Sequence, residues 1–238
     1  MERTLISGPP KPGEPEYVVT PNGVYLWHDN PFVRGWTKCD DIEQLCRYAE
    51  DDREVDTSIV WRAAKIPLEL FCTILGTIQH GPREEVGFVL YYRTNDRKWF
   101  AVVPKQAGSA CHVEFDGAVR DDGFVACGSV HTHPNIGARW SHQDIDNHET
   151  WCGLHFVVST QTREKSKVHY IKDILATVFV PGAHFDVPLS SVVSGWNDDC
   201  KLAAVEFDGC KEWLKTLQAG QRKRRKEMKK CTGSMFWD

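Results

Sequence analysis

Apolar residues recur along the chain with two spacings, which together indicate a protein of helices and strands. After Ile66-Pro67 they recur every three or four positions as far as Gly81-Pro82, and this spacing predicts a helix. A shorter, more polar helix is expected over Ser141–Cys152. Branched and aromatic residues predict strands at Val86–Arg93, Trp99–Val103, Cys111–Phe115, Phe124–Val130, Leu154–Ser159, Lys167–Lys172 and Ile174–Val180. The order of helix, strands, helix and strands favours an α/β or α+β fold.

The N-terminal region has a different pattern. Residues 1–16 are rich in Pro, Gly and Glu and predict an extended arm. Tyr17–Thr20 and Val24–His28 flank Pro21-Asn22-Gly23 and predict a β-hairpin, because Asn-Gly favours a turn with positive φ. A short helix is expected over Asp41–Glu50.

The C-terminal region is predicted to be helical. Cys200–Leu217 has apolar residues at helical spacing, and the basic segment Arg222–Lys230 follows it. We therefore divide the chain into three parts. These are an arm, hairpin and short helix over residues 1–60, a core over 61–185, and a helical extension with a basic tail over 186–238.

Composition narrows the class of protein. The chain has 238 residues with 41% hydrophobic and 26% charged side chains, which are ordinary globular values. No apolar run reaches the roughly 18 residues of a membrane span, and the first ten residues lack a secretory apolar segment, so we expect a cytoplasmic protein. Nine scattered cysteines without a Cys-x-x-Cys pair argue against a disulfide framework or a cysteine zinc site. The net charge of −4 does not favour nucleic-acid binding by the whole chain.

One group of residues has the spacing of a catalytic metal site. His131 and His133 are two residues apart, so on an extended segment their side chains leave the same face. Pro134 lacks an N–H group and ends the strand. Ser141 is a favourable helix N-cap, and Asp144 stands three residues further, so its carboxylate can return toward the strand end. Two imidazoles and one carboxylate form a catalytic zinc set, because a fourth tetrahedral position stays open to water.

A hydrolase with such a site also needs a proton carrier. A glutamate just outside the metal ligands can take the proton of the attacking water and pass it to the leaving amine. Glu84 and Glu85, between the first predicted helix and its strand, are both candidates. The Ser141 hydroxyl has a second possible task, since it can donate to the oxyanion of a tetrahedral intermediate.

These residues resemble the pattern of the JAMM metalloproteases, also called the JAB or MPN-plus family. That pattern is a Glu, then His-Ser/Thr-His-Pro, then Ser and Asp at the spacing found here, and the resemblance runs roughly from Ile66 to Pro181. The family's glutamate precedes a glycine by three positions, which favours Glu84 over Glu85 because of Gly87. The resemblance implies a mixed β-sheet sandwiched by helices, here with an N-terminal hairpin extension and a C-terminal helix.

The resemblance also implies roles for single residues. His131, His133 and Asp144 would bind Zn²⁺, Glu84 would be the general acid/base, and Ser141 would assist the oxyanion. The implied activity is that of a zinc-dependent peptidase or isopeptidase that cuts at the C-terminal tail of a ubiquitin-like protein or conjugate.

The layout after the motif indicates which members of the family are similar. Asp144 is followed closely by the next predicted strand, without the insertions of eukaryotic deubiquitinases. The compact arrangement resembles prokaryotic, plasmid-borne or viral members, including the JAB protein of PRTRC-type mobile gene clusters. That resemblance implies an E1-like activating enzyme and a small ubiquitin-like protein as partners. The segment Arg222–Lys230 favours an acidic partner or nucleic acid.

Two other functions stay open from the sequence. One is a non-catalytic MPN-type module that binds proteins and keeps its zinc for stability or docking. The other is a RadC-like DNA-associated protein, although the usual His-Asn-His-Pro-Ser-Gly pattern is not matched at Thr132 and Asn135. Near the motif, His142 and His148 are candidates for steering a substrate, and Trp140 is a candidate wall of the cleft.

Overall fold

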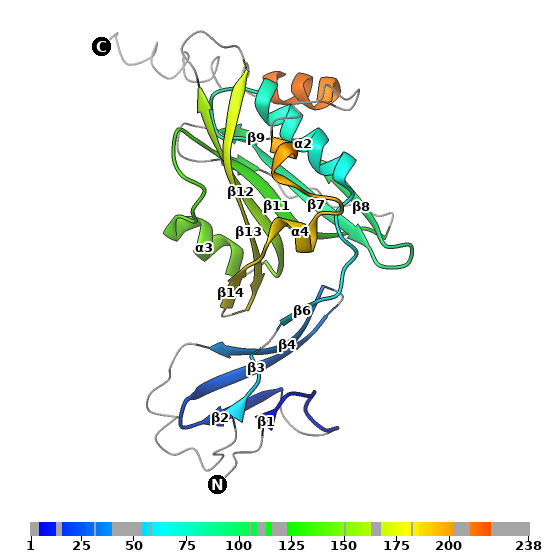
Figure 1. The fold of residues 1–238 in the computed structure, drawn as a ribbon, viewed down its shortest axis with the longest axis vertical. Coiled ribbons are helices and arrows are strands. Elements are labelled where there is room, and N and C mark those ends of the chain that lie inside the picture. Colours follow the sequence, from blue (N-terminus) through cyan, green and yellow to red (C-terminus); the bar gives the residue numbers. More distant parts are fainter. Residues whose placement is uncertain are drawn as a thin grey trace, which may run out of the picture.

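Two β-sheets and a few helices make up the fold (Figure 1). The computed structural model describes residues 5–12, 16–30, 32–39, 54–57, 59–104, 106–108, 113–115, 123–149, 151–162, 168–181, 183–201 and 210–219. The predicted helix over Asp41–Glu50 and the basic segment Arg222–Lys230 lie outside these residues. No helix among the described residues is long and apolar enough to cross a membrane.

The larger sheet has six strands in the order β14-β13-β12-β11-β7-β8. Strands β11 and β12 are parallel, and every other neighbouring pair in this sheet is antiparallel. The mixed sheet therefore confirms the α+β class expected from the sequence. The strands are β7 (Gly87–Arg93), β8 (Lys98–Val102), β11 (Val125–Pro134), β12 (Gly153–Thr162), β13 (His169–Val180) and β14 (Ala183–Asp186).

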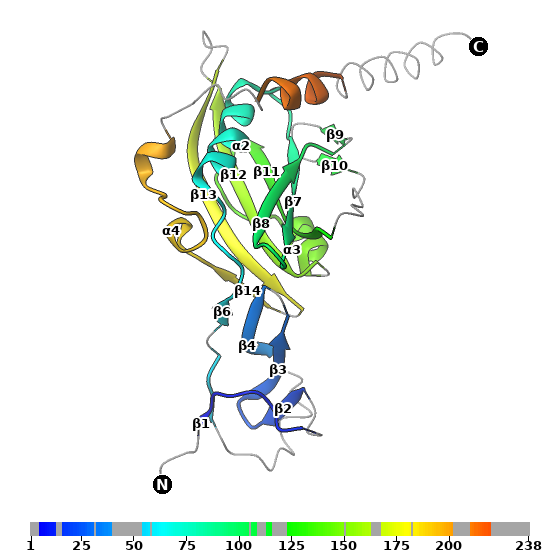
Figure 2. The ribbon, with the colours of Figure 1, turned by 90° about the vertical axis from the view of Figure 1, so that its right-hand side faces the viewer.

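Helices cover both faces of this sheet (Figure 2). Helix α2 (Leu68–His80) packs its apolar side on one face, where Phe71 lies 5.0 Å from Phe156 between ring centroids. It begins after Pro67 and ends at Gly81, as the spacing predicts, because Pro82 cannot continue it. The shorter helix α3 (His142–Glu149) lies over the opposite face.

The N-terminal part is a second, four-stranded antiparallel sheet in the order β2-β3-β4-β6. Its strands are β2 (Tyr17–Thr20), β3 (Gly23–Asp29), β4 (Val33–Cys39) and β6 (Ile59–Trp61), and a short pair of β1 (Leu5–Ile6) and β5 (Glu54–Val55) lies beside it. The predicted hairpin is confirmed as β2 and β3, but its turn differs. Thr20 pairs with Gly23, so Pro21 and Asn22 are the central residues, and the positive φ falls on Gly23 (+150°).

Aromatic side chains join the two sheets. Trp61 of β6 stacks on Trp99 of β8 at 6.5 Å, and Phe32 before β4 contacts Tyr92 of β7 at 5.9 Å between ring centroids. Phe32 and the following Val33 are buried in the same core as α2 and the six-stranded sheet. The N-terminal sheet therefore shares part of the main hydrophobic core.

Smaller elements complete the described chain. They are a hairpin of β9 (Gln106–Gly108) and β10 (Val113–Phe115), helix α4 (Leu189–Val192), a 3₁₀ turn η1 (Asp198–Lys201) and a helix over 210–219. The helix predicted over Cys200–Leu217 is thus confirmed over 210–217, while Cys200 and Lys201 belong to the 3₁₀ turn and residues 202–209 lie outside the described residues. The two strands predicted at Lys167–Lys172 and Ile174–Val180 are wrong as separate elements. They form the single strand β13, whose pairing with β12 shifts at a bulge near Asp173.

The close approach of β11 and β12 depends on Gly128. A Cβ at this residue would lie 1.9 Å from the carbonyl oxygen of Leu154. We expect Gly128→Ala to lower the free energy of unfolding by about 3 kcal/mol or more, because overpacking must push the two parallel strands apart. Gly137→Ala is the control, since no atom lies within 4 Å of its added Cβ, and it should change stability by less than about 1 kcal/mol. Urea unfolding of both variants measures the difference, and equal stabilities would contradict the strand geometry.

Candidate metal centre

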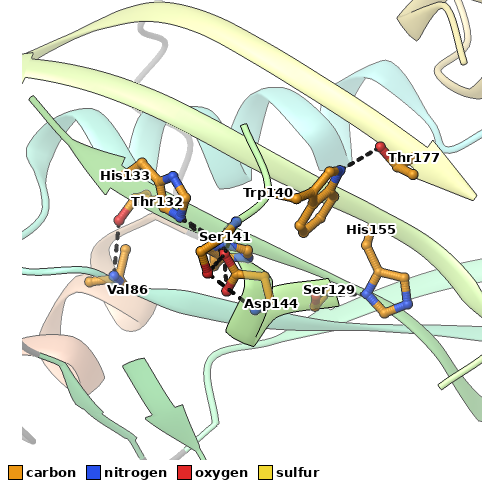
Figure 3. A network of polar contacts seen from close by, with 10 residues as sticks. Val86, Ser129, Thr132, His133, Trp140, Ser141, Asp144, His155 and Thr177 are labelled. Carbon is orange, nitrogen blue, oxygen red and sulfur yellow. Dashed lines mark hydrogen bonds and ion pairs between the residues drawn. The ribbon is translucent and has the colours of Figure 1, made fainter. Parts of the chain in front are cut away.

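The end of β11 presents two imidazoles on one face of the sheet. His131 and His133 are both buried, and their Nε2 atoms lie 3.2 Å apart. The strand ends at Pro134, as predicted, and Thr132 between the histidines faces the other side. Figure 3 shows His133 turned toward Ser141 and Asp144 at the start of α3.

A tight turn after β11 brings the chain back over the histidines. Asn135 has φ of +61°, a left-handed conformation that asparagine tolerates better than most residues. Its backbone N–H donates to the Thr160 carbonyl at 2.6 Å, and its side-chain oxygen accepts from the Thr162 N–H at 3.2 Å. The Ser159 hydroxyl also donates to the Ile136 carbonyl. These bonds fix the turn to the end of β12.

Helix α3 starts with a reciprocal cap between Ser141 and Asp144. The Asp144 N–H donates to Ser141 Oγ at 3.1 Å, while Asp144 Oδ2 accepts from the Ser141 N–H at 2.9 Å and the Ser141 hydroxyl at 2.6 Å. This is the capping arrangement that the sequence predicts. It orients the carboxylate before any metal binds.

The three predicted ligands meet at a spacing that fits zinc. Asp144 Oδ1 lies 3.6 Å from His131 Nε2, and Asp144 Oδ2 lies 3.6 Å from His133 Nε2. Zinc bonds of about 2.0–2.1 Å at tetrahedral angles place ligand atoms about 3.3–3.4 Å apart. The observed separations of 3.2–3.6 Å are close to this value. His131, His133 and Asp144 can therefore hold one metal ion.

Electrostatics act differently on the three side chains, and they favour the metal-binding form of His131 and of Asp144. Burial lowers the pKa of His131, which favours its neutral, ligating form. Burial acts the same way on His133, but Asp144 outweighs it and raises the pKa of His133, with Glu85 adding to the increase. Although burial opposes it, contact with both imidazoles and Ser141 holds the pKa of Asp144 well below its usual range. The carboxylate is therefore ionised at neutral pH.

The other ring nitrogen of His133, Nδ1, also bears on metal binding through Nε2. Nδ1 is buried and has no hydrogen-bond partner among the described residues. The Gly137 carbonyl lies near enough to raise the pKa of His133, although the contact falls short of hydrogen-bond geometry. Metal-bound histidines usually donate their other N–H to such a carbonyl, which fixes the tautomer.

Trp140 connects the site to the rest of the sheet. Its ring lies 5.6 Å from the His131 ring and 5.0 Å from Phe179 between centroids. Its Nε1–H donates to the Thr177 hydroxyl at 2.7 Å, and that hydroxyl donates to Asp186 at 2.6 Å. Trp140 thus packs on a metal ligand, as a wall of the site would. Thr177 and Asp186 have no signal in the sequence, because they lie on β13 and β14, far from the motif.

The two candidate glutamates differ in their surroundings. Glu85 is only 5% exposed and acts electrostatically on His133, whereas Glu84 is half-buried. The role of Glu84 stays a prediction. His142 is exposed on the first turn of α3, and the side chain of His148 lies outside the described residues.

A family model of prokaryotic homologs of the JAB domain matches residues 53–170, which include both glutamates, both histidines, Ser141 and Asp144. This part of the chain is a prokaryotic JAB domain. A crystal structure of a JAB1/MPN domain protein from Archaeoglobus fulgidus is similar at 18% identity and a TM-score of 0.32, over 52% of this chain and 96% of that chain. No curated protein matches the sequence. The match of the family model confirms the sequence-based assignment of this part of the chain to the family.

Zinc binding by the JAB domain is directly measurable. Asp144→Asn removes the charge of one ligand but keeps its shape, and we expect zinc affinity to fall at least about 100-fold. Asp146→Asn is a matched control, because Asp146 is an exposed carboxylate on the same helix. It should leave zinc affinity within about twofold of the parent. Competition with a fluorescent chelator measures both, and equal affinities would remove Asp144 from the ligand set.

Proposed function

We propose that the JAB domain is a zinc-dependent peptidase or isopeptidase. The observation that carries this proposal is the three-ligand set of His131, His133 and Asp144 at zinc spacing. A structural zinc site is usually closed by a fourth protein ligand. Within the described residues the group of metal-binding side chains ends at these three, which favours an open, catalytic position. This also counts against a module that keeps zinc only for docking.

The chain's own residues would divide the work. The imidazoles and Asp144 would hold the ion, and Trp140 would keep His131 in place from the sheet side. A bound zinc ion supplies an activated water and polarises the scissile carbonyl. The protein must then move one proton from the water to the leaving amine, which needs a carboxylate within hydrogen-bond reach.

We propose that one glutamate of the Glu84–Glu85 pair carries this proton. The strand register and the burial of the side chain favour Glu85. The register pairs Gly87 with His131, so continuing it places Glu85 beside His133. Its burial and its effect on His133 agree with this position. The spacing of the family motif favours Glu84 instead. The motif and the strand register therefore favour two neighbouring residues.

Ser141 is committed to Asp144 in this structure. Its hydroxyl hydrogen and its N–H both point to the same carboxylate oxygen, at 2.6 and 2.9 Å. To donate to an oxyanion, the hydroxyl would have to turn away from Asp144. The serine therefore serves first to hold a metal ligand, and assistance to the oxyanion is a second role that we propose for it.

The substrate we propose is the C-terminal tail of a ubiquitin-like protein or conjugate, with an E1-like enzyme as a partner. The support is the family resemblance of the motif and the compact core. An extended tail can add to a sheet edge as a strand, a common way of binding peptides. An acidic partner or nucleic acid at Arg222–Lys230 stays a prediction from the sequence.

Removal of the metal tests the proposal. The zinc-loaded protein should cleave a fusion in which a ubiquitin-like C-terminal tail is joined to a reporter. Treatment with a zinc chelator should lower the rate by more than about 100-fold, and one equivalent of zinc should restore it. The Asp144→Asn variant is the inactive control. If the loaded parent cleaves neither peptide-linked nor isopeptide-linked fusions, the hydrolase proposal is wrong.

Paired glutamine variants identify the proton carrier. Glu85→Gln should lower kcat by about 100-fold or more with zinc binding retained, because an amide cannot accept the proton of the water. Glu84→Gln keeps the same chemistry one residue away and should retain most of the activity. Steady-state kinetics on the cleaved fusion measures both. The reverse result would return the role to Glu84.

A further inference from the structure

Thr132, between the two metal-binding histidines, has its own set of contacts. Its side chain faces away from the imidazoles and is buried. Its hydroxyl accepts the Val86 N–H at 3.0 Å, and its backbone N–H donates to the Val86 carbonyl at 3.0 Å. Figure 3 shows the bond between Val86 and the threonine hydroxyl.

This contact replaces part of the β-ladder. In a regular antiparallel pair, both bonds between two facing residues join backbone groups. The regular register of β7 and β11 ends with Gly87 and His131, one residue earlier. At the next pair, the Thr132 hydroxyl stands in for its backbone carbonyl as the acceptor of the Val86 N–H. The segment that carries Glu84 and Glu85 is therefore attached to β11 by one backbone bond and one side-chain bond.

The other edge of β7 is held in the same manner. The Gly87 N–H donates to Gln106 Oε1 at 2.8 Å, and Gln106 Nε2 donates to the Gly87 carbonyl at 2.8 Å. The ladder with β8 has already ended at Val89 and Val102. Side-chain groups thus fix the beginning of β7 from both sides, next to the two glutamates.

We infer that Thr132 is a positioning residue that sets where the carboxylate of the Glu84–Glu85 pair lies relative to the metal ligands. This inference rests on the proposed hydrolase function. Displacement of a catalytic group by about 1 Å can cost about 100-fold in rate. Without the hydroxyl, the buried Val86 N–H loses its acceptor, and the segment must move to find another. The histidines point to the other face of β11, so their hold on zinc should not depend on this bond.

Two variants of Thr132 separate positioning from general support. Thr132→Val keeps the shape of the side chain and removes the acceptor, and Thr132→Ser keeps the acceptor with one methyl group fewer. We expect Thr132→Val to lower kcat by about 10- to 100-fold, with KM and zinc affinity within about twofold of the parent. Thr132→Ser should keep kcat near the parent value. Amide hydrogen exchange at Val86, measured without substrate or activity, should be faster in Thr132→Val and unchanged in Thr132→Ser.

Several results would overturn the inference. One is an unchanged kcat in Thr132→Val despite faster exchange at Val86. Another is a parallel loss of zinc affinity, which would make Thr132 a support of the whole ligand strand. If Thr132→Val does not fold, Thr132→Ala removes the same acceptor with less crowding. A parent that binds zinc but cleaves nothing would instead overturn the proposed function, so the two failures are distinguishable.

Discussion

The Asp144 carboxylate makes two sets of contacts at once, and the arrangement of the site depends on both. It closes the N-terminus of α3 with Ser141, and it lies at ion-pair distance from His131 and His133. The first contact is local and needs only the helix start. The second needs the turn after β11 to return the chain over the strand end. The same carboxylate therefore couples a helix cap to the two imidazoles of the metal centre.

Much of this arrangement is predictable because it is local in sequence. The alternation of His131 and His133 on an extended strand, the strand end at Pro134 and the cap at Ser141 each follow from a few neighbouring residues. The helix α2 follows in the same way from its apolar spacing and its Pro and Gly ends. Each of these patterns determines the local geometry within a few residues, so the sequence alone predicts these elements.

What the sequence could not provide comes from contacts between distant strands. The Trp140 side chain donates a hydrogen bond to Thr177, and Thr177 donates one to Asp186. Both contacts depend on the strand order of the sheet, which no local pattern reveals. Two strands of the N-terminal sheet, β4 and β6, were missed for the same reason, since they are recognisable only once they are paired. The bulge that makes β13 one strand is likewise a property of its pairing with β12.

For Glu84 and Glu85, the motif spacing and the strand register favour different residues. Motif spacing assumes that the chain before Gly87 behaves as in other members of the family. Here the regular ladder ends at Gly87, and the Thr132 hydroxyl holds the next residue. This bond keeps Val86 opposite Thr132, and because strand side chains alternate, a continued register puts Glu85 on the face of the histidines. We therefore propose that the Thr132 side chain, between the two candidate metal ligands, helps to determine which of the two glutamates faces them.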